Sequence, residues 1–153
     1  MSTRTPPPRE KTREARSDEP LLIAENRNLL PLYVAHGITA VRDAAGDLSP
    51  SVLEWRAAVA AGTLQGPAVF TSGPKLEGIN SVWPGDLEVG SEAEVRAALD
   101  NLQAMGVDFV KITENTLTPA LYMYGLREAT RRGFATSAHV PVAVTLDQAS
   151  EAG

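Results

Sequence analysis

Two short runs, VDFVKIT at residues 107–113 and FATSAHV at residues 134–140, decide the fold. The first run is apolar and β-branched, as buried strands usually are, and the second has a similar length and spacing. Between them, Thr118 and Pro119 form a favourable helix start, and Gly133 is a favourable helix end. Parallel strands that are joined through a helix lie side by side. The stretch therefore predicts a strand, helix, strand unit with a parallel sheet.

One polar residue of chemical interest stands near the end of each run, Lys111 in the first and His139 in the second. In adjacent parallel strands, residues at these positions lie at the same edge of the sheet. The carboxyl edge of the strands is where α/β proteins carry their active sites. We therefore expect Lys111 and His139 to face one site.

Composition limits the class of protein and its partners. The 153 residues fit one domain, and the formal net charge of −5 argues against general binding to nucleic acid or to an anionic membrane. There are no cysteines, so disulfides and thiolate metal sites are excluded. No apolar run approaches the roughly 18 residues of a membrane span.

The N-terminal residues 1–20 are polar, mixed in charge and rich in proline. Such a segment buries too little apolar surface to offset the entropy of ordering, so we expect a disordered tail before a folded domain at residues 21–153. The tail also has no apolar core of the kind that a secretory signal needs. We therefore expect a cytoplasmic protein.

Further strands are predicted near Ile38 and Ala68, each followed by a helix, as are the strands near Val107 and Phe134. About four parallel strands that alternate with helices indicate an α/β domain, either part of a (β/α)8 barrel or a small open sheet, since a full barrel needs about 250 residues. Neither a dinucleotide-binding nor a P-loop glycine motif follows any strand. The segment 73–90 has no periodicity and is expected to be a long functional loop.

Helix boundaries follow from capping residues and prolines. Pro31 fits only the first turn of a helix that ends at His36-Gly37, so a longer helix from Leu21 would have to kink. Ser49-Pro50 is expected to start the next helix. The sequences SEAE (91–94) and TLDQ (145–148) each predict a capping box.

Lys111 has three alternative roles. Its amine could reach solvent at the strand end, or act with a lowered pKa as a Schiff-base amine, or carry CO2 as a carbamate that serves as an anionic metal ligand. His139 could be a metal ligand or a hydrogen-bonded histidine of the core or a loop.

Four other residues are weaker candidates. His36 precedes a helix-ending glycine, and Asp43 is expected in a local turn or an ion pair with Arg42. Lys75 and Trp83 lie in the long loop, where substrate contact and loop packing are both open. No nucleophile with its base is visible, so we assign no catalytic residue. Metal-assisted hydrolysis is the one mechanism with two suitably placed groups, Lys111 and His139.

Several ordered segments resemble the amidohydrolase superfamily, in its imidazolonepropionase-like and prolidase-like branch. Residues 32–43 resemble the helix and strand two of that barrel, 66–74 strand three, 107–112 strand four, and 138–141 strand five with its helix at 149–153. The resemblance implies a (β/α)8 barrel enzyme that hydrolyses amide-type, cyclic amide or ester bonds with one or two divalent metals. It also implies that Lys111 is the lysine that some members carboxylate and that His139 is the strand-five metal ligand.

The sequence also departs from the family pattern. The His-x-His pair of the first strand is absent, since His36 and His139 are the two histidines of the chain. The sixth-strand histidine and eighth-strand aspartate have no counterpart. We therefore expect an internal fragment that covers strands two to five, with an incomplete zinc or other divalent metal site and no activity by itself.

The substrate implied by the resemblance is a small amide or a dipeptide, and the residues that would bind it remain unknown. Two alternatives stay open. One is a lyase of the aldolase type that uses Lys111 as a Schiff-base amine. The other is a non-catalytic assembly module that associates with itself through the open edges of its sheet.

Overall fold

The computed structural model describes residues 9–10, 19–44, 46 and 48–153. Most of the predicted tail at residues 1–20 lies outside the described residues. Of the tail residues that are described, strand β1 (Arg9–Glu10) pairs antiparallel with strand β5 (Leu87–Val89). Helix α1 begins at Glu19, just before the predicted end of the tail. The domain boundary at residue 20 stays a prediction.

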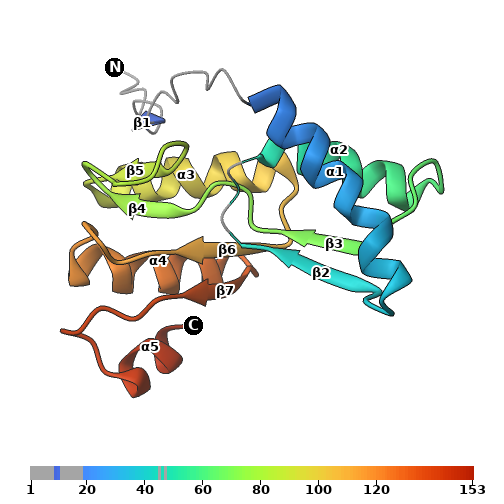
Figure 1. Cartoon of the computed structure of the whole chain (residues 1–153). Helices are drawn as coiled ribbons and strands as arrows, with labels where there is room; N and C mark the ends of the chain where they lie inside the picture. Colours follow the sequence, from blue (N-terminus) through green and yellow to red (C-terminus); the bar gives the residue numbers. More distant parts are fainter. Residues whose placement is uncertain (1–8, 11–18, 45, 47) are drawn as a thin grey trace.

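The four predicted strands and the helices that follow them are present, which confirms the α/β fold class of a partial (β/α) barrel (Figure 1). Each of the four strand regions is followed along the chain by one helix. The strands are β2 (Ala40–Asp43), β3 (Ala68–Thr71), β6 (Phe109–Ile112) and β7 (Ala135–Ala138), and the helices are α2 (Ser49–Ala60), α3 (Glu92–Met105), α4 (Pro119–Arg131) and α5 (Leu146–Ala152). The pairs β2 with β3 and β6 with β7 are parallel.

The third strand region runs past β3 into a second short strand, β4 (Leu76–Gly78), and both parts lie beside β6. The N–H of Asp108 donates to the carbonyl of Thr71 at 2.9 Å, and Leu76 pairs with Ile112 further along the same strand. Because β6 contacts β3 at its beginning and β4 at its end, the strands follow one another in chain order, as in a barrel wall.

The expectation of a loop without regular structure at residues 73–90 is wrong, because this segment contains both β4 and β5. The two strands have three residues each and pair in parallel, with Leu76 opposite Leu87. Their sequences, LEG and LEV, are too short for an alternating pattern to distinguish them from a loop.

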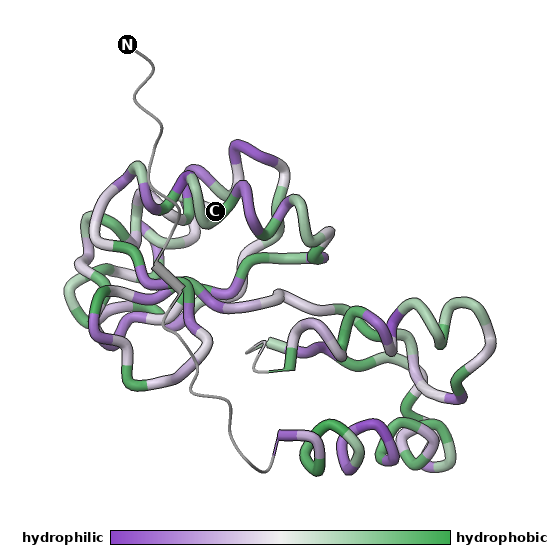
Figure 2. The backbone as a smooth tube through the Cα atoms, turned by 90° about the horizontal axis from the view of Figure 1, so that it is seen from above, coloured by the Kyte–Doolittle hydropathy of each residue, from purple (hydrophilic) through white to green (hydrophobic). Residues whose placement is uncertain are grey.

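Helices cover one face of β2 and β3 and leave the other face open. Val69 packs with Leu30, Val52 and Trp55 in a small core beneath α1 (Glu19–Ala35) and α2. On the opposite face, Phe70 is 46% exposed. Figure 2 shows that these two strands and two helices project from the larger body formed by the remaining strands and helices.

The larger body has its own core, which α3, α4 and α5 cover. Its fully buried side chains include Leu76, Leu99, Val110, Ile112 and Tyr122. Every residue of β6 is buried, in contrast with the alternating pattern of β2 and β3. Lys111 is therefore held in a strand with no exposed face.

Two helix starts differ from the prediction. Helix α1 continues through Pro31 as one element of 17 residues, so Pro31 is not confined to the first turn. Helix α2 begins at Ser49, with Leu48 rather than Ser49 at the cap and with Pro50 in the first turn. The hydroxyl of Ser49 instead donates to the carbonyl of Gly46.

Among the described residues, no helix is both long and apolar enough to cross a bilayer. The cytoplasmic location expected from the sequence stays a prediction.

Candidate functional site

A pocket of about 510 Å³ lies at the carboxyl edge of the strands. Its volume is in the range of sites that bind small molecules. It is lined by Arg42, Asp43, Ala44, Lys75, Trp83, Lys111, Thr113, Asn115 and His139. The structure thus brings together the two predicted ligands, Lys111 and His139. Three of the weaker candidates, Asp43, Lys75 and Trp83, line the same pocket.

Strand register places Lys111 and His139 on one face. Lys111 lies opposite Ser137, and the N–H of His139 donates to the carbonyl of Ile112 at 3.2 Å. Because side chains alternate between the two faces of a strand, Lys111 and Thr113 share a face with Ser137 and His139. The predicted adjacency of Lys111 and His139 at one sheet edge is confirmed.

Lys111 is 9% exposed as a residue and lines the pocket. Burial lowers the pKa of Lys111, the carboxylate of Glu114 partly opposes that effect, and the cations Lys75 and Arg42 add to it. Among the described residues, no carboxylate forms an ion pair with Lys111. An amine in this environment suits a Schiff base or a carbamate, and its place in the pocket lining also leaves the solvent-reaching alternative open.

His139 lies beside Glu114, a residue that was not among the candidates predicted from the sequence. The Nδ1 atom of His139 lies 3.3 Å from Oε2 of Glu114, while 61% of the imidazole side chain remains exposed. A carboxylate at one ring nitrogen leaves the other nitrogen available for a ligand, as is usual for histidines at metal sites. Glu114 directly follows the predicted strand at 107–113, which carries Lys111. This place in the sequence could have identified Glu114 as a candidate site residue.

The described residues do not make a complete metal centre. No group of three or more histidine, cysteine, aspartate and glutamate residues in the described part of the chain could hold an ion. A catalytic zinc site usually has three protein ligands, and Lys111 and His139 provide two. The sequence expectation that both bind metal is therefore neither confirmed nor contradicted.

Asp43 and Arg42 have separate roles. Oδ2 of Asp43 accepts a hydrogen bond from the hydroxyl of Thr71 at 2.7 Å. The guanidinium of Arg42 instead lies over the ring of Phe109, with Cζ 4.4 Å from the ring centroid. Asp43 thus links β2 to β3, whereas Arg42 reaches across the open face toward β6.

Lys75 and Trp83 belong to one hydrogen-bonded segment beside the pocket. Nζ of Lys75 lies 2.7 Å from Oδ1 of Asp86 and 5.9 Å from the centroid of the Trp83 ring. The backbone N–H of Trp83 donates to the hydroxyl of Ser81, which in turn donates to Asp86. These contacts fix the wall of the pocket without burying Trp83, which is 56% exposed.

His36 lies outside this pocket, at the end of α1, where its backbone N–H donates to the carbonyl of Leu32. Gly37 follows with φ of 79°, a left-handed conformation that glycine adopts without strain. This confirms the helix-end interpretation of His36.

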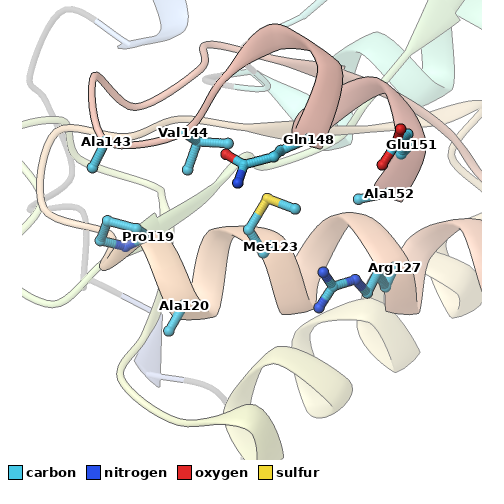
Figure 3. A pocket seen from close by; sticks show the side chains of 9 residues that line it. All are labelled: Pro119, Ala120, Met123, Arg127, Ala143, Val144, Gln148, Glu151 and Ala152. Carbon is cyan, nitrogen blue, oxygen red and sulfur yellow. The ribbon is translucent and has the colours of Figure 1, made fainter.

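A second hollow, of about 460 Å³, lies between α4 and α5 (Figure 3). Its side chains come from those helices and from the segment before α5, and they include Met123, Arg127, Gln148 and Glu151. None of the strand-end residues lines it, so it is separate from the candidate site.

Comparison with known proteins identifies similar folds among solved structures, whereas no protein-family model and no curated protein sequence matches. A bottromycin amidohydrolase superposes with a TM-score of 0.71 at 27% identity, over 80% of this chain and 27% of its own. A Xaa-Pro dipeptidase with bound methionine in its active site gives a TM-score of 0.70 at 19% identity, over 95% and 43%. The ochratoxinase of A. niger gives 0.67 at 20% identity, over 86% and 38%.

This chain therefore spans well under half the length of each of these three structures.

Proposed function

Because the chain folds as part of a barrel of the amidohydrolase superfamily, we propose that it carries part of the active site of a metal-dependent hydrolase of amide-type bonds. The observation that carries the proposal is the meeting of Lys111 and His139 in one pocket at the carboxyl edge of adjacent parallel strands. Small amides or dipeptides are the proposed substrates of the complete site.

In this proposal, Lys111 and His139 are two ligands of a divalent metal centre, with zinc as the leading ion. Lys111 would bind as its carbamate, because a cationic ammonium group has no lone pair for a metal. His139 would bind through Nε2, because Glu114 lies beside Nδ1. Two ligands are too few for tight zinc binding, so we expect the 153-residue chain to bind metal weakly and to hydrolyse no dipeptide.

Isothermal titration of the whole chain with zinc in bicarbonate buffer tests the ligand assignment. We expect a weak binding event that is lost in His139→Ala and in Lys111→Met. The matched control is His36→Ala, which removes the other histidine and should leave that event unchanged. Binding that persists in His139→Ala would contradict the assignment, and stoichiometric zinc with dipeptide turnover would contradict the expected inactivity.

The Schiff-base alternative is favoured by a specific observation, the burial of an amine beside the cations Lys75 and Arg42. Treatment with an aldehyde and borohydride, followed by peptide mass spectrometry, tests it. Selective labelling of Lys111 at low aldehyde concentration would support a lyase of the aldolase type. Labelling no stronger than that of the other lysines would remove this alternative.

A non-catalytic assembly role is favoured by the open face of β2 and β3, where Phe70 is exposed. In the described sheets, the outer edges of β2 and β7 also have no strand partner. Such edges promote association with other chains. Sedimentation over a range of concentrations should show a larger species that Phe70→Lys weakens, whereas a monomer at every concentration would exclude this role.

A further inference from the structure

The outer face of α1 carries apolar side chains that are open to solvent. Leu29, Leu32 and Tyr33 are 44%, 53% and 37% exposed, whereas Leu30 is the one buried residue of this helix, all of which the structure describes. Figure 2 shows α1 at the rim of the molecule, with hydrophobic residues along its length. Exposed apolar side chains that cluster in this way mark an interaction surface.

A hollow of about 300 Å³ lies on this outer face. It is lined by Leu29, Leu32, Tyr33, His36 and Ile38. No residue of this lining also lines the pocket at the strand ends, so the hollow does not belong to the candidate active site. Its walls are suited to the apolar side chains of a partner.

Four residues along this face have a symmetric order. The intervals between them are four, three and four positions, in the order Glu25, Leu29, Leu32 and His36. At about 100° per residue, all four fall within about 60° of one another around the helix. His36 directly follows the last residue of α1, and its backbone N–H keeps the helical hydrogen bond to the carbonyl of Leu32. The face therefore presents two leucines with an acid at one end and a histidine at the other.

This order is complementary to itself when two copies of the helix pack antiparallel. With a twofold axis midway between Leu29 and Leu32, each Leu29 faces Leu32 of the second copy, and each Glu25 faces His36 of the second copy. Apolar residues spaced by three and four positions form a continuous seam between two packed helices. A twofold interface makes every such contact twice. The occupant that this face fits is therefore the same face of a second copy.

The charges at the two ends select the antiparallel direction. Glu25 and His36 are both exposed, and neither forms an ion pair within the described part of the chain. An imidazole N–H donates to a carboxylate whether the ring is neutral or charged. Parallel packing would instead place the two copies of Glu25 against each other, and like charges across an interface oppose association.

We propose that two copies of this chain associate through the outer faces of their α1 helices, packed antiparallel about a twofold axis between Leu29 and Leu32. The interface is one helix wide, so the dimer is weak and reversible, with a dissociation constant on the order of 10 µM. This association requires neither the proposed hydrolase function nor the open face of β2 and β3 that carries Phe70.

Sedimentation velocity of the whole chain from about 1 to about 300 µM brackets this affinity. We expect a monomer–dimer equilibrium. Leu32→Glu should lower the dimer affinity at least about a hundredfold, because each dimer would then bury two carboxylates in place of two leucines. The control is the same change at another exposed helix residue, Leu146→Glu in α5, which should leave the affinity unchanged. Because both leucines are exposed in the monomer, circular dichroism should show that both variants fold.

A pair of charge variants tests the direction of packing. His36→Glu places two carboxylates opposite each other at both ends of the interface and should weaken the dimer about tenfold. Adding Glu25→Lys to that variant restores opposite charges in the antiparallel arrangement, so the double variant should recover the wild-type affinity. In a parallel arrangement the double variant would still set like charges against each other.

A monomer at every concentration would overturn the proposal. A dimer that withstands Leu32→Glu would also overturn it, as would a double variant no tighter than His36→Glu alone. If Phe70→Lys weakens a dimer that Leu32→Glu does not affect, the open sheet face is the interface, and the assembly role stands while the α1 pairing fails. The zinc titration is decided by Lys111 and His139, so its result does not depend on this one.

Discussion

Nζ of Lys75 lies 2.7 Å from Oδ1 of Asp86, and these two side chains are among the most buried charges of the described structure. Lys75 precedes β4 and Asp86 precedes β5, so the pair joins the two ends of the segment that carries Trp83. The N–H of Leu87 also donates to the carbonyl of Lys75 at 2.9 Å. The segment is thereby closed at its base by one ion pair and one backbone hydrogen bond.

Asp86→Ala should lower the free energy of unfolding by about 3–5 kcal/mol, because it leaves the ammonium group of Lys75 buried without a counter-charge. The double variant Lys75→Met/Asp86→Leu replaces the pair with apolar side chains and should be clearly more stable than the single variant. Urea unfolding of both proteins measures the difference. If Asp86→Ala were as stable as the wild type, the ion pair between Lys75 and Asp86 would not contribute to stability in the way expected of a buried pair.

Glu77→Gln should destabilise the chain by at least about 2 kcal/mol. The carboxylate of Glu77 is fully buried and accepts hydrogen bonds from the backbone N–H groups of Gly78, Asn115, Thr116 and Leu117. A glutamine would place its own N–H₂ group against some of these donors. Glu54→Gln, at an exposed position of α2, is the control and should change the urea midpoint little.

The same carboxylate should make stability depend on pH. Burial alone would raise the pKa of Glu77, but the donors around it outweigh burial and hold the pKa below its ordinary value of 4.5. A depressed pKa in the folded state gives stability that is present above pH 4.5 and is lost as the pH falls below that value. Glu77→Gln should flatten this part of the stability curve, and an unchanged slope would contradict the assignment.

Gly78→Ala should destabilise by about 1–3 kcal/mol or more, since it forces a side chain into a packed backbone contact. A Cβ atom at Gly78 would lie 2.1 Å from the carbonyl oxygen of Thr116. The control is Gly125→Ala in α4, where the new Cβ would lie 3.5 Å from Ile112, an ordinary contact. Because alanine favours a helix, thermal unfolding should show that Gly125→Ala is neutral or slightly stabilising, in contrast with Gly78→Ala.

Glu128→Gln should weaken the packing of α4 on α3 and remove an acid-sensitive part of the stability. Oε1 of Glu128 lies 2.8 Å from Nε of Arg132, whose NH1 lies 2.5 Å from Asp100 of α3. Hydrogen bonds from Arg131 and Arg132 lower the pKa of Glu128 to about 2. Its contribution is therefore complete above pH 4.5 and is lost as the pH falls from 4.5 toward 2.

Stability curves of Glu128→Gln and of the wild type should consequently converge as the pH falls through this range. Glu54→Gln, at an exposed position of α2, should give a curve parallel to that of the wild type. A constant difference between Glu128→Gln and the wild type across the range would show that Glu128 acts through packing and not through its charge.

The sequence predicted the features of this fold that have a local signal. The runs at 107–113 and 134–140 contain β6 and β7. β6 is buried throughout, as its consecutive apolar and β-branched residues predict. Parallel pairing then follows from the helix between the two strands, so Lys111 and His139 were found from spacing alone. Thr145 and Gln148 form the predicted capping box, with both reciprocal hydrogen bonds present.

Two features of the hydrogen bonding could not be predicted from the sequence, the exact partners of a capping residue and the distant partners of Glu77. Ser91 accepts a hydrogen bond from the N–H of Glu94, as expected, but Oε2 of Glu94 accepts from Gly90 and from the hydroxyl of Ser91. Glu77 stands in a three-residue strand and, apart from the adjacent Gly78, has its donors 38 to 40 positions further along. No periodicity in the sequence marks such a residue, since only the folded chain brings its donors together.

The closed base of the segment between Lys75 and Asp86 separates the effects of substitutions at its tip from those of substitutions at its base. Its ion pair and its backbone hydrogen bond are internal to the segment and do not pass through Lys111 or His139. Replacement of Trp83 by another side chain should therefore leave this ion pair intact and the two strand-end residues in register. Replacement of Lys75, in contrast, should also change the electrostatic environment of Lys111.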